Sequence, residues 1–130
     1  YVWILYAGFG VILGHNFPFY LNFKGGKGIA ATAGIVTSLD WRLMLLCLAA
    51  FVLVVAVTRY VSLGSLIVST ILVVWNVGMG QMGAYGLSAA ARPEFYGISA
   101  VIAAMAFWRH RANIVRLVQG KENKVGAKKK

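Results

Sequence analysis

The chain has 130 residues, of which 60% are hydrophobic and only 12% are charged, and its formal net charge is +10. Soluble globular domains are about 45–50% apolar and about 25% charged, and a soluble domain of this length could not bury so much apolar surface. Strands are not expected, because open sheet edges are not tolerated in lipid and no alternating pattern recurs. The composition therefore predicts an all-α fold, a polytopic integral membrane helix bundle.

Five apolar segments follow one another along the chain. A full span needs about 20 helical residues, and several of these segments are shorter. We therefore expect about five short or tilted membrane helices within a membrane-embedded domain at 1–120, followed by a basic cytoplasmic tail at 121–130. The segments comprise residues 1–14, 28–39, 42–57, 61–78 and 95–108.

The basic residues are distributed unevenly between the connections. If each segment crosses the membrane once, 11 of the 13 basic residues fall on one side, and only Arg42 and Arg92 fall on the other. This asymmetry is typical of a cytoplasmic face, and it explains most of the net charge without a nucleic-acid partner. The residues on the basic side are Lys24, Lys27, Arg59, Arg109, Arg111, Arg116, Lys121, Lys124 and Lys128 to Lys130.

A glycine-rich sequence, "FKGGKG" at residues 23–28, interrupts the apolar pattern. Glycines allow a positive φ and a close approach of the backbone to a ligand. If a helix begins after Gly28, its first amides are unpaired and its dipole is positive there, and Lys27 would complete a site for an anion such as phosphate. The spacing fits neither a Walker loop nor a dinucleotide fingerprint. The alternative is a flexible cytoplasmic turn whose lysines mark topology.

A second polar cluster follows the last apolar segment, in "WRHRANIVRLVQGKE" at 108–122. His110, Asn113 and Arg116 are at helical spacing and span roughly 120° of a helix surface, so they could converge on one site. The alternative is an amphipathic helix at the membrane interface. A third sequence, "TRYVSLGS" at 58–65, places Arg59 on the same side, where it could equally be a topogenic charge.

Together, "GHNFPFYLNFKGGKGIAAT", "RYVSLGS" and "WRHRANIVRLVQGKE" resemble, in order, the bacterial acyl-phosphate:glycerol-3-phosphate acyltransferase family. The resemblance implies a multi-pass enzyme of the bacterial inner membrane whose active face and C-terminus are cytoplasmic. Its partners would be acyl phosphate, glycerol 3-phosphate and the lipid bilayer, and its product lysophosphatidic acid for phospholipid synthesis. The family's earlier loop, with a Ser-x-Asn and Gly-Ala-Thr-Asn pattern, has no counterpart here. The chain is therefore expected to correspond to the later part of such an enzyme.

The family chemistry suggests roles for these residues. Acyl phosphate is an activated mixed anhydride, so the enzyme needs to position two anionic substrates and requires no acyl-enzyme. We expect Gly25, Gly26 and Gly28 to present backbone amides to a phosphate, and Lys27 to supply positive charge.

His110 and Asn113 would orient the acceptor or the phosphate, and His110 could carry a proton; proton removal by the acyl phosphate itself is equally compatible with the sequence. Arg116 is either a phosphate clamp or a headgroup anchor.

Four further residues are expected to support the site: His15, Arg59, Ser62 and Glu122. For His15 a helix-end hydrogen bond is an equally good interpretation. No metal or other cofactor is expected, because the two histidines are far apart in sequence and the single cysteine has no partner. The alternative function is a non-enzymatic membrane module or an anion-transporter fragment, which should place polar groups in mid-membrane.

Overall fold

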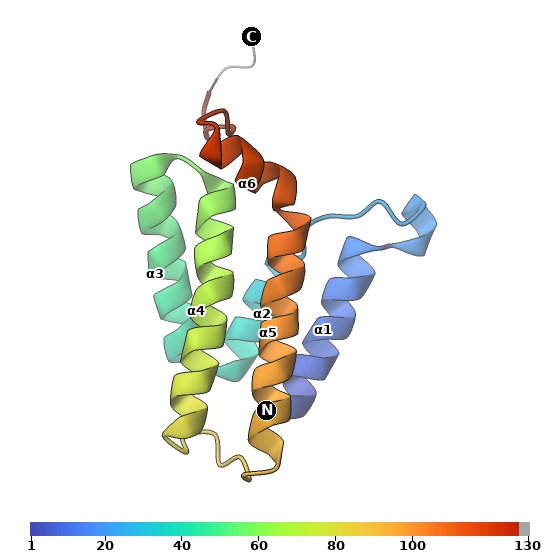
Figure 1. Cartoon of the computed structure of the whole chain (residues 1–130), viewed down its shortest axis with the longest axis vertical. Helices are drawn as coiled ribbons and strands as arrows, with labels where there is room; N and C mark the ends of the chain where they lie inside the picture. The colour runs from blue at the N-terminus through green and yellow to red at the C-terminus, as the bar shows by residue number, and fades with distance from the viewer. Residues whose placement is uncertain (128–130) are drawn as a thin grey trace.

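The computed structural model describes residues 1–127, and it is helical without strands over that range. The expectations for Lys128 to Lys130 lie outside the described residues. Figure 1 shows the helices as a bundle in which α6 lies across one end. The elements are α1 (Val2–Asn16), a 3-10 turn η1 (Phe19–Leu21), α2 (Ile29–Leu39), α3 (Trp41–Thr58), α4 (Val61–Gln81), α5 (Ala91–Arg109) and α6 (Arg111–Val118).

Each of the five predicted apolar segments lies in one of the helices α1 to α5. Three stretches are long and apolar enough to cross a membrane: Val2–Leu21, Trp41–Thr58 and Val61–Gln81. The helix α2 has only 11 residues, so it is short, as its sequence predicts. The helix α5 begins at Ala91, before the predicted start at residue 95, because a proline and charged residues are tolerated in a first turn whose amides have no helical partner.

The helix α4 packs between α3 and α5, while α1 packs against α2 and α5 (Figure 1). Leu43, Leu72 and Phe95, one from each of α3, α4 and α5, are completely buried where these helices meet. Close approach requires small residues on α4. A Cβ at Gly80 would lie 2.6 Å from the Tyr96 hydroxyl on α5, so a larger residue there would push the helices apart.

A set of buried polar groups joins α4 to α5. Asn76 Nδ2 donates to Ser99 Oγ at 2.9 Å, and Ser99 Oγ donates to the carbonyl of Phe95 at 2.8 Å. The Tyr85 hydroxyl donates to Asn76 Oδ1 at 3.4 Å. The Asn76–Ser99 bond joins the two helices, as expected for an interhelical polar contact in lipid.

The two ends of the bundle differ in charge. The glycine loop (residues 23–28), the turn between α3 and α4, and α6 lie at one end, and the first turns of α3 and α5, which carry Arg42 and Arg92, lie at the other (Figure 1). Arg42 is paired with Asp40 at 2.9 Å. The strongly basic end is therefore also the end where the glycine loop meets α6.

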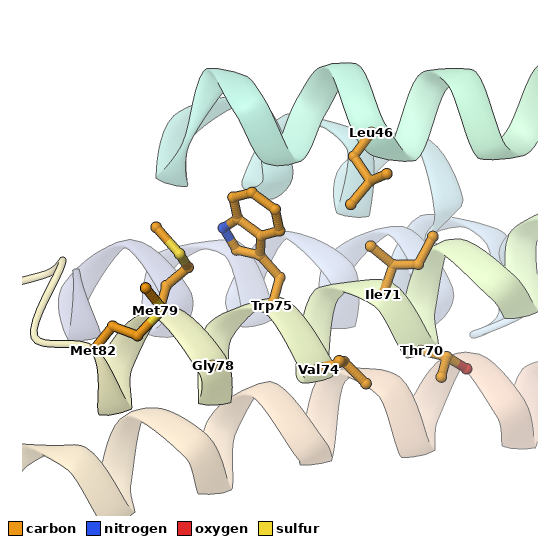
Figure 2. Close-up of a pocket in the computed structure, with 8 residues that line it drawn as sticks. All are labelled: Leu46, Thr70, Ile71, Val74, Trp75, Gly78, Met79 and Met82. Atoms are coloured by element: carbon orange, nitrogen blue, oxygen red, sulfur yellow. The ribbon is translucent and has the colours of Figure 1, made fainter.

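A lipid-facing groove of about 340 Å³ runs between α3 and α4. Trp75 reaches from α4 toward α3, and Leu46 points from α3 toward α4 (Figure 2). The groove offers no charged group to a ligand, so the anion chemistry predicted from the sequence has to lie elsewhere. Its lining consists of Leu46, Thr70, Ile71, Val74, Trp75, Gly78, Met79 and Met82.

Candidate functional site

A chain of polar contacts links the glycine loop to α6 and the segment after it. Lys27 Nζ donates to Asn113 Oδ1 at 2.6 Å, and Asn113 Nδ2 donates to Glu122 Oε1 at 2.8 Å. Arg116 Nε donates to Glu122 Oε2 at 2.9 Å. Asn113 and Glu122 are buried, whereas Lys27 is exposed. The structure thus brings Lys27 of the glycine loop together with Asn113, Arg116 and Glu122, which lie more than 80 residues further along the sequence.

A tight turn after α6 returns Glu122 to that helix. Gly120 adopts a φ of +67°, its amide bonds to the carbonyl of Leu117 at 3.1 Å, and the amide of Lys121 bonds to the carbonyl of Arg116 at 2.8 Å. This is the Schellman pattern that a glycine after a helix favours. The sequence "VQGKE" therefore reverses the chain so that the Glu122 carboxylate faces α6.

Lys27, Asn113 and Glu122 line a polar cavity of about 390 Å³ at the basic end of the bundle, and Arg116 lies outside its lining. His110, Ser62 and Ser65 add to it from the ends of α5 and α4, and the segment after Glu122 forms one wall. The lining consists of Lys27, Ile29, Val61, Ser62, Ser65, His110, Asn113, Glu122, Asn123, Lys124 and Val125. A cavity with a lysine, an imidazole, an amide and hydroxyls can hold a small phosphorylated molecule.

The ionisable groups around the cavity shift one another's pKa values. Burial would raise the pKa of Glu122, but hydrogen bonds from Asn113 and Arg116 and the positive charge of Arg116 outweigh it and lower that pKa. Partial burial of its ammonium group lowers the pKa of Lys27; the carboxylate of Glu122 opposes this shift, while Arg116 and Arg109 add to it. Glu122 is therefore ionised at neutral pH and partly balances the cations beside it.

His110 follows the last residue of α5 and is 2% exposed. Its Nδ1 lies 2.7 Å from the carbonyl oxygen of Ala106. A carbonyl only accepts, so Nδ1 carries the proton, and in the neutral ring Nε2 is left as the basic nitrogen. Burial lowers the pKa of His110, the bond to Ala106 opposes this, and the positive charge of Lys27 adds to the lowering. The ring is thus a neutral base at pH 7.

The glycine loop differs from the expected phosphate cradle. The amide of Gly25 bonds to the carbonyl of Asn16 at 3.2 Å, and the amide of Gly26 bonds to the carbonyl of His15 at 3.1 Å. The expectation that these two amides face a phosphate is therefore wrong for this conformation. The last carbonyls of α1 have no helical partner, and they compete successfully for the same donors.

Glycine is still required at these positions, for a steric reason. A Cβ at Gly25 would collide with the carbonyl oxygen of His15, and one at Gly26 would collide with the imidazole of His15. Gly28 has a φ of +76° and forms the N-cap of α2. The glycines therefore let the loop lie directly on the end of α1, so that Lys27 faces Asn113.

The start of α2 keeps the features of an anion site. Within residues 1–127 no side chain caps this helix; Thr32 bonds only to the carbonyl of Gly28. The first amides after Gly28 thus remain available beside Lys27. Asn16 lies against Gly28, fully buried, and its amide group has no hydrogen-bond partner among the described residues.

The expected supporting residues occupy different places. Ser62 lines the cavity with a buried hydroxyl. His15 packs against Gly26 and lies outside the cavity lining. Arg59 also lies outside it and donates from Nε to the carbonyl of Val125 at 2.9 Å, while the amide of Val125 bonds to the carbonyl of Arg59 at 2.9 Å. Arg59 therefore holds the segment that forms one wall of the cavity.

Sequence reasoning did not place Arg109 or Ser65 in the site. Arg109 donates to the carbonyls of Gly25 and Gly26 from the end of α5, and Ser65 lines the cavity one turn below Ser62. In the sequence Arg109 is one of several basic residues around His110, and nothing in that pattern distinguishes it. The spacing of the two serines, one helical turn apart, could have indicated a shared face.

Comparison with known proteins settles the family. A family model described as "Glycerol-3-phosphate acyltransferase" matches residues 1–120. The chain belongs to the glycerol-3-phosphate acyltransferase family. A glycerol-3-phosphate acyltransferase of Paramagnetospirillum magneticum is 38% identical over 99% of this chain, and one of Rhodospirillum rubrum is 41% identical over 97%. The chain spans 62% and 53% of the length of these two relatives.

Two solved structures of this family share the fold. Both are of PlsY, an integral membrane glycerol 3-phosphate acyltransferase, one in a glycerol 3-phosphate form and one in a lysophosphatidic acid form. The TM-scores are 0.77 and 0.75 at 29% and 30% identity, over 94% of this chain and 56% and 57% of PlsY. The all-helical, membrane-embedded architecture predicted from composition is therefore confirmed, and the resemblance seen in the three sequence motifs is confirmed with it.

Proposed function

We propose that this chain carries the substrate-binding half of an acyltransferase that moves a fatty acyl group from acyl phosphate to glycerol 3-phosphate. The observation that carries this proposal is the polar cavity in which Lys27, His110 and Asn113 converge beside the uncapped start of α2. The family membership and the forms in which PlsY has been solved support glycerol 3-phosphate as the acceptor. The acyl-phosphate donor is an inference from the sequence motifs.

In this scheme a substrate phosphate replaces Asn113 as the partner of Lys27 and is held by the first amides of α2. Asn113 and His110 then orient the acceptor. The acceptor hydroxyl oxygen bonds to the acyl carbonyl carbon, the anhydride C–O bond breaks, and phosphate leaves. The hydroxyl proton passes to His110 Nε2 or to the departing phosphate. Arg116 holds the Glu122 carboxylate, which in turn fixes the Asn113 amide.

An apolar groove gives the acyl chain a place beside this cavity. The groove has a volume of about 470 Å³ and lies between α2, α3 and α4. Ile29 lines both the groove and the polar cavity, so the two adjoin. Met44 and Phe51 of α3 also line it. An acyl chain in this groove would enter sideways from the bilayer, with its reactive end at the basic end of the bundle.

The proposed location is the inner membrane of a bacterium, with the cavity facing the cytoplasm and residues 121–130 forming a basic tail on that side. The uneven distribution of Lys and Arg supports this orientation. Residues such as Lys121 and Lys124 would also lie near anionic lipid headgroups, where each gains about 1 kcal/mol.

The test is acyl transfer by the membrane-embedded protein that contains this chain. Palmitoyl phosphate and glycerol 3-phosphate are expected to give lysophosphatidic acid and phosphate, and palmitoyl-CoA is expected to give none. Incubation with radiolabelled palmitoyl phosphate without acceptor should leave the protein unlabelled, because no hydrogen bond among the described residues joins His110 to Ser62 or Ser65, and no cysteine lines the cavity. Transfer from the thioester alone would refute the proposed donor, and a label that turns over on addition of acceptor would refute direct transfer.

A further inference from the structure

Arg109, the last residue of α5, hydrogen-bonds to the backbone of the glycine loop. Its Nε donates to the carbonyl of Gly26 at 3.1 Å, and its Nη2 donates to the carbonyls of Gly25 at 2.9 Å and Gly26 at 2.6 Å. A planar guanidinium presents such donors in a fixed fork, which an ammonium cannot reproduce. The two carbonyls are therefore held in a defined orientation from α5.

The guanidinium is itself held in place by aromatic rings. It lies 5.2 Å from the centroid of the Phe17 ring and 5.9 Å from that of Trp108. Phe17 directly follows α1, and its ring is 6.1 Å from that of Trp108. Arg109 thus joins three parts at once: the end of α1, the end of α5 and the glycine loop.

Among the described residues, two sets of hydrogen bonds connect the glycine loop to α5 and α6, the helices on either side of His110. One is the bond from Lys27 Nζ to Asn113 Oδ1, and the other is the set of bonds from Arg109. A phosphate that binds Lys27 competes with Asn113 for the same ammonium. If a phosphate replaces Asn113 as the partner of Lys27, the bonds from Arg109 to Gly25 and Gly26 are still in place and hold the glycine loop beside α5.

We propose that Arg109 is a positioning residue, which keeps the glycine loop against α5 so that Lys27 stays opposite His110 while a substrate phosphate is bound. Arg109 donates its hydrogen bonds to carbonyls and therefore acts on the substrate only through Lys27. The kinetic part of this inference rests on the proposed acyltransferase function, whereas the ordering of the loop can be measured without it.

Arg111 provides a matched control. It carries the same charge at the same end of the bundle, two residues further along. It is exposed, it donates to the carbonyl of Trp108 at 3.0 Å, and it lies 4.6 Å from the Trp108 ring. Among the described residues, Arg111 makes no hydrogen bond to the glycine loop, and it is not part of the cavity lining.

The first measurement is the mobility of a spin label at Lys24→Cys, in a Cys47→Ala background, with the membrane-embedded protein in nanodiscs. The label is expected to become more mobile in Arg109→Gln, to a smaller extent in Arg109→Lys, and to be unchanged in Arg111→Gln. If Arg109→Gln cannot be recovered folded, Arg109→Lys carries the same comparison with Arg111→Lys. Equal mobility in the Arg109 and Arg111 variants would overturn the inference.

The second measurement is the kinetics of acyl transfer. Because small misplacement of a substrate can cost on the order of a hundredfold in rate, Arg109→Gln is expected to lower kcat/KM by about that factor, mainly through a higher KM for glycerol 3-phosphate. Arg109→Lys should recover part of the loss, and Arg111→Gln should match the wild type. A mobilised loop with unchanged kinetics would overturn the positioning role. A wild-type protein without transfer activity would instead refute the proposed function, and the spin-label result would then decide the inference alone.

Discussion

Lys27 is unusual because its side chain is exposed yet held in one place. Its ammonium bonds to Asn113, whose other amide atom is fixed by the buried carboxylate of Glu122. An ordinary surface lysine loses about 2 kcal/mol of rotamer entropy when it is ordered in this way. The contact therefore distinguishes Lys27 from Lys24, which has no side-chain hydrogen bond among those of the described residues.

Substitution of Lys27 and of Lys24 tests whether the glycine loop belongs to a substrate site. Lys27→Arg is expected to lose most acyl-transfer activity, on the order of a hundredfold, because the wider guanidinium cannot take the place of a compact ammonium without displacing the phosphate. Lys24→Arg is the control and should keep most of its activity. Lysophosphatidic acid formation is measured at equal expression. Near wild-type activity in both variants would make the loop an ordinary basic turn.

His110 links stability to pH. Because its pKa in the folded protein lies below the unfolded value near 6.5, the unfolded chain binds the proton more tightly, so stability should fall as pH drops below about 6.5 and should not change through this group above it. The measurement is the unfolding midpoint in detergent, between about pH 5.5 and 7.5, for the wild type and His110→Gln. The wild type should lose more stability on acidification than the variant; parallel curves would contradict the buried neutral ring.

The residue types and spacings in the sequence were enough to predict much of the candidate site. Of the three residues predicted to converge, His110 and Asn113 line the cavity, whereas Arg116 lies outside its lining and is linked to Asn113 through Glu122. The roles of Gly25 and Gly26 were not predictable, because they depend on carbonyls at the end of α1 that compete for the same amides. Arg109 was missed for a similar reason, since its partners are backbone atoms more than 80 residues away.

At the scale of helices, apolar runs predicted the existence of α1 to α5 well and their ends less well. The first turn of α5 contains Arg92, Pro93 and Glu94, residues that break an apolar run but fit the start of a helix. The pairing of helices could not be predicted, because it depends on which small residues face each other. Gly80 against Tyr96 is one such contact, and the sequence alone does not pair them.

The buried bond between Asn76 and Ser99 is expected to stabilise the α4–α5 pair. Asn76→Ala leaves the Tyr85 hydroxyl without this partner, and loss of an interhelical hydrogen bond in a membrane protein costs about 0.6 kcal/mol on average and up to about 1.7. Unfolding in a denaturing detergent should show a loss in this range. Thr70→Ala on the same helix is the control, because Thr70 bonds only to the carbonyl of Leu66 within α4. Equal losses in the two variants would refute the interhelical role.

At the scale of the whole molecule, the uneven charge predicts which end faces the cytoplasm. In a Cys47→Ala background, Lys24→Cys and Lys124→Cys should react with a membrane-impermeant maleimide in inverted vesicles and not in intact cells. Ala84→Cys, in the exposed loop between α4 and α5 at the opposite end, should show the reverse. Reaction of Lys24→Cys and Lys124→Cys from opposite sides would contradict the arrangement of the bundle as well as its orientation.

The contact between Lys27 and Asn113 joins residues 86 positions apart. Contacts at such separation form late, because the entropy of closing the intervening loop has to be overcome first. During synthesis Lys27 leaves the ribosome long before Glu122 does, and the cavity cannot exist until the turn after α6 has been made. The cavity is therefore a mark of completed assembly: a nascent chain that ends before Glu122 can hold several inserted helices and still lack it.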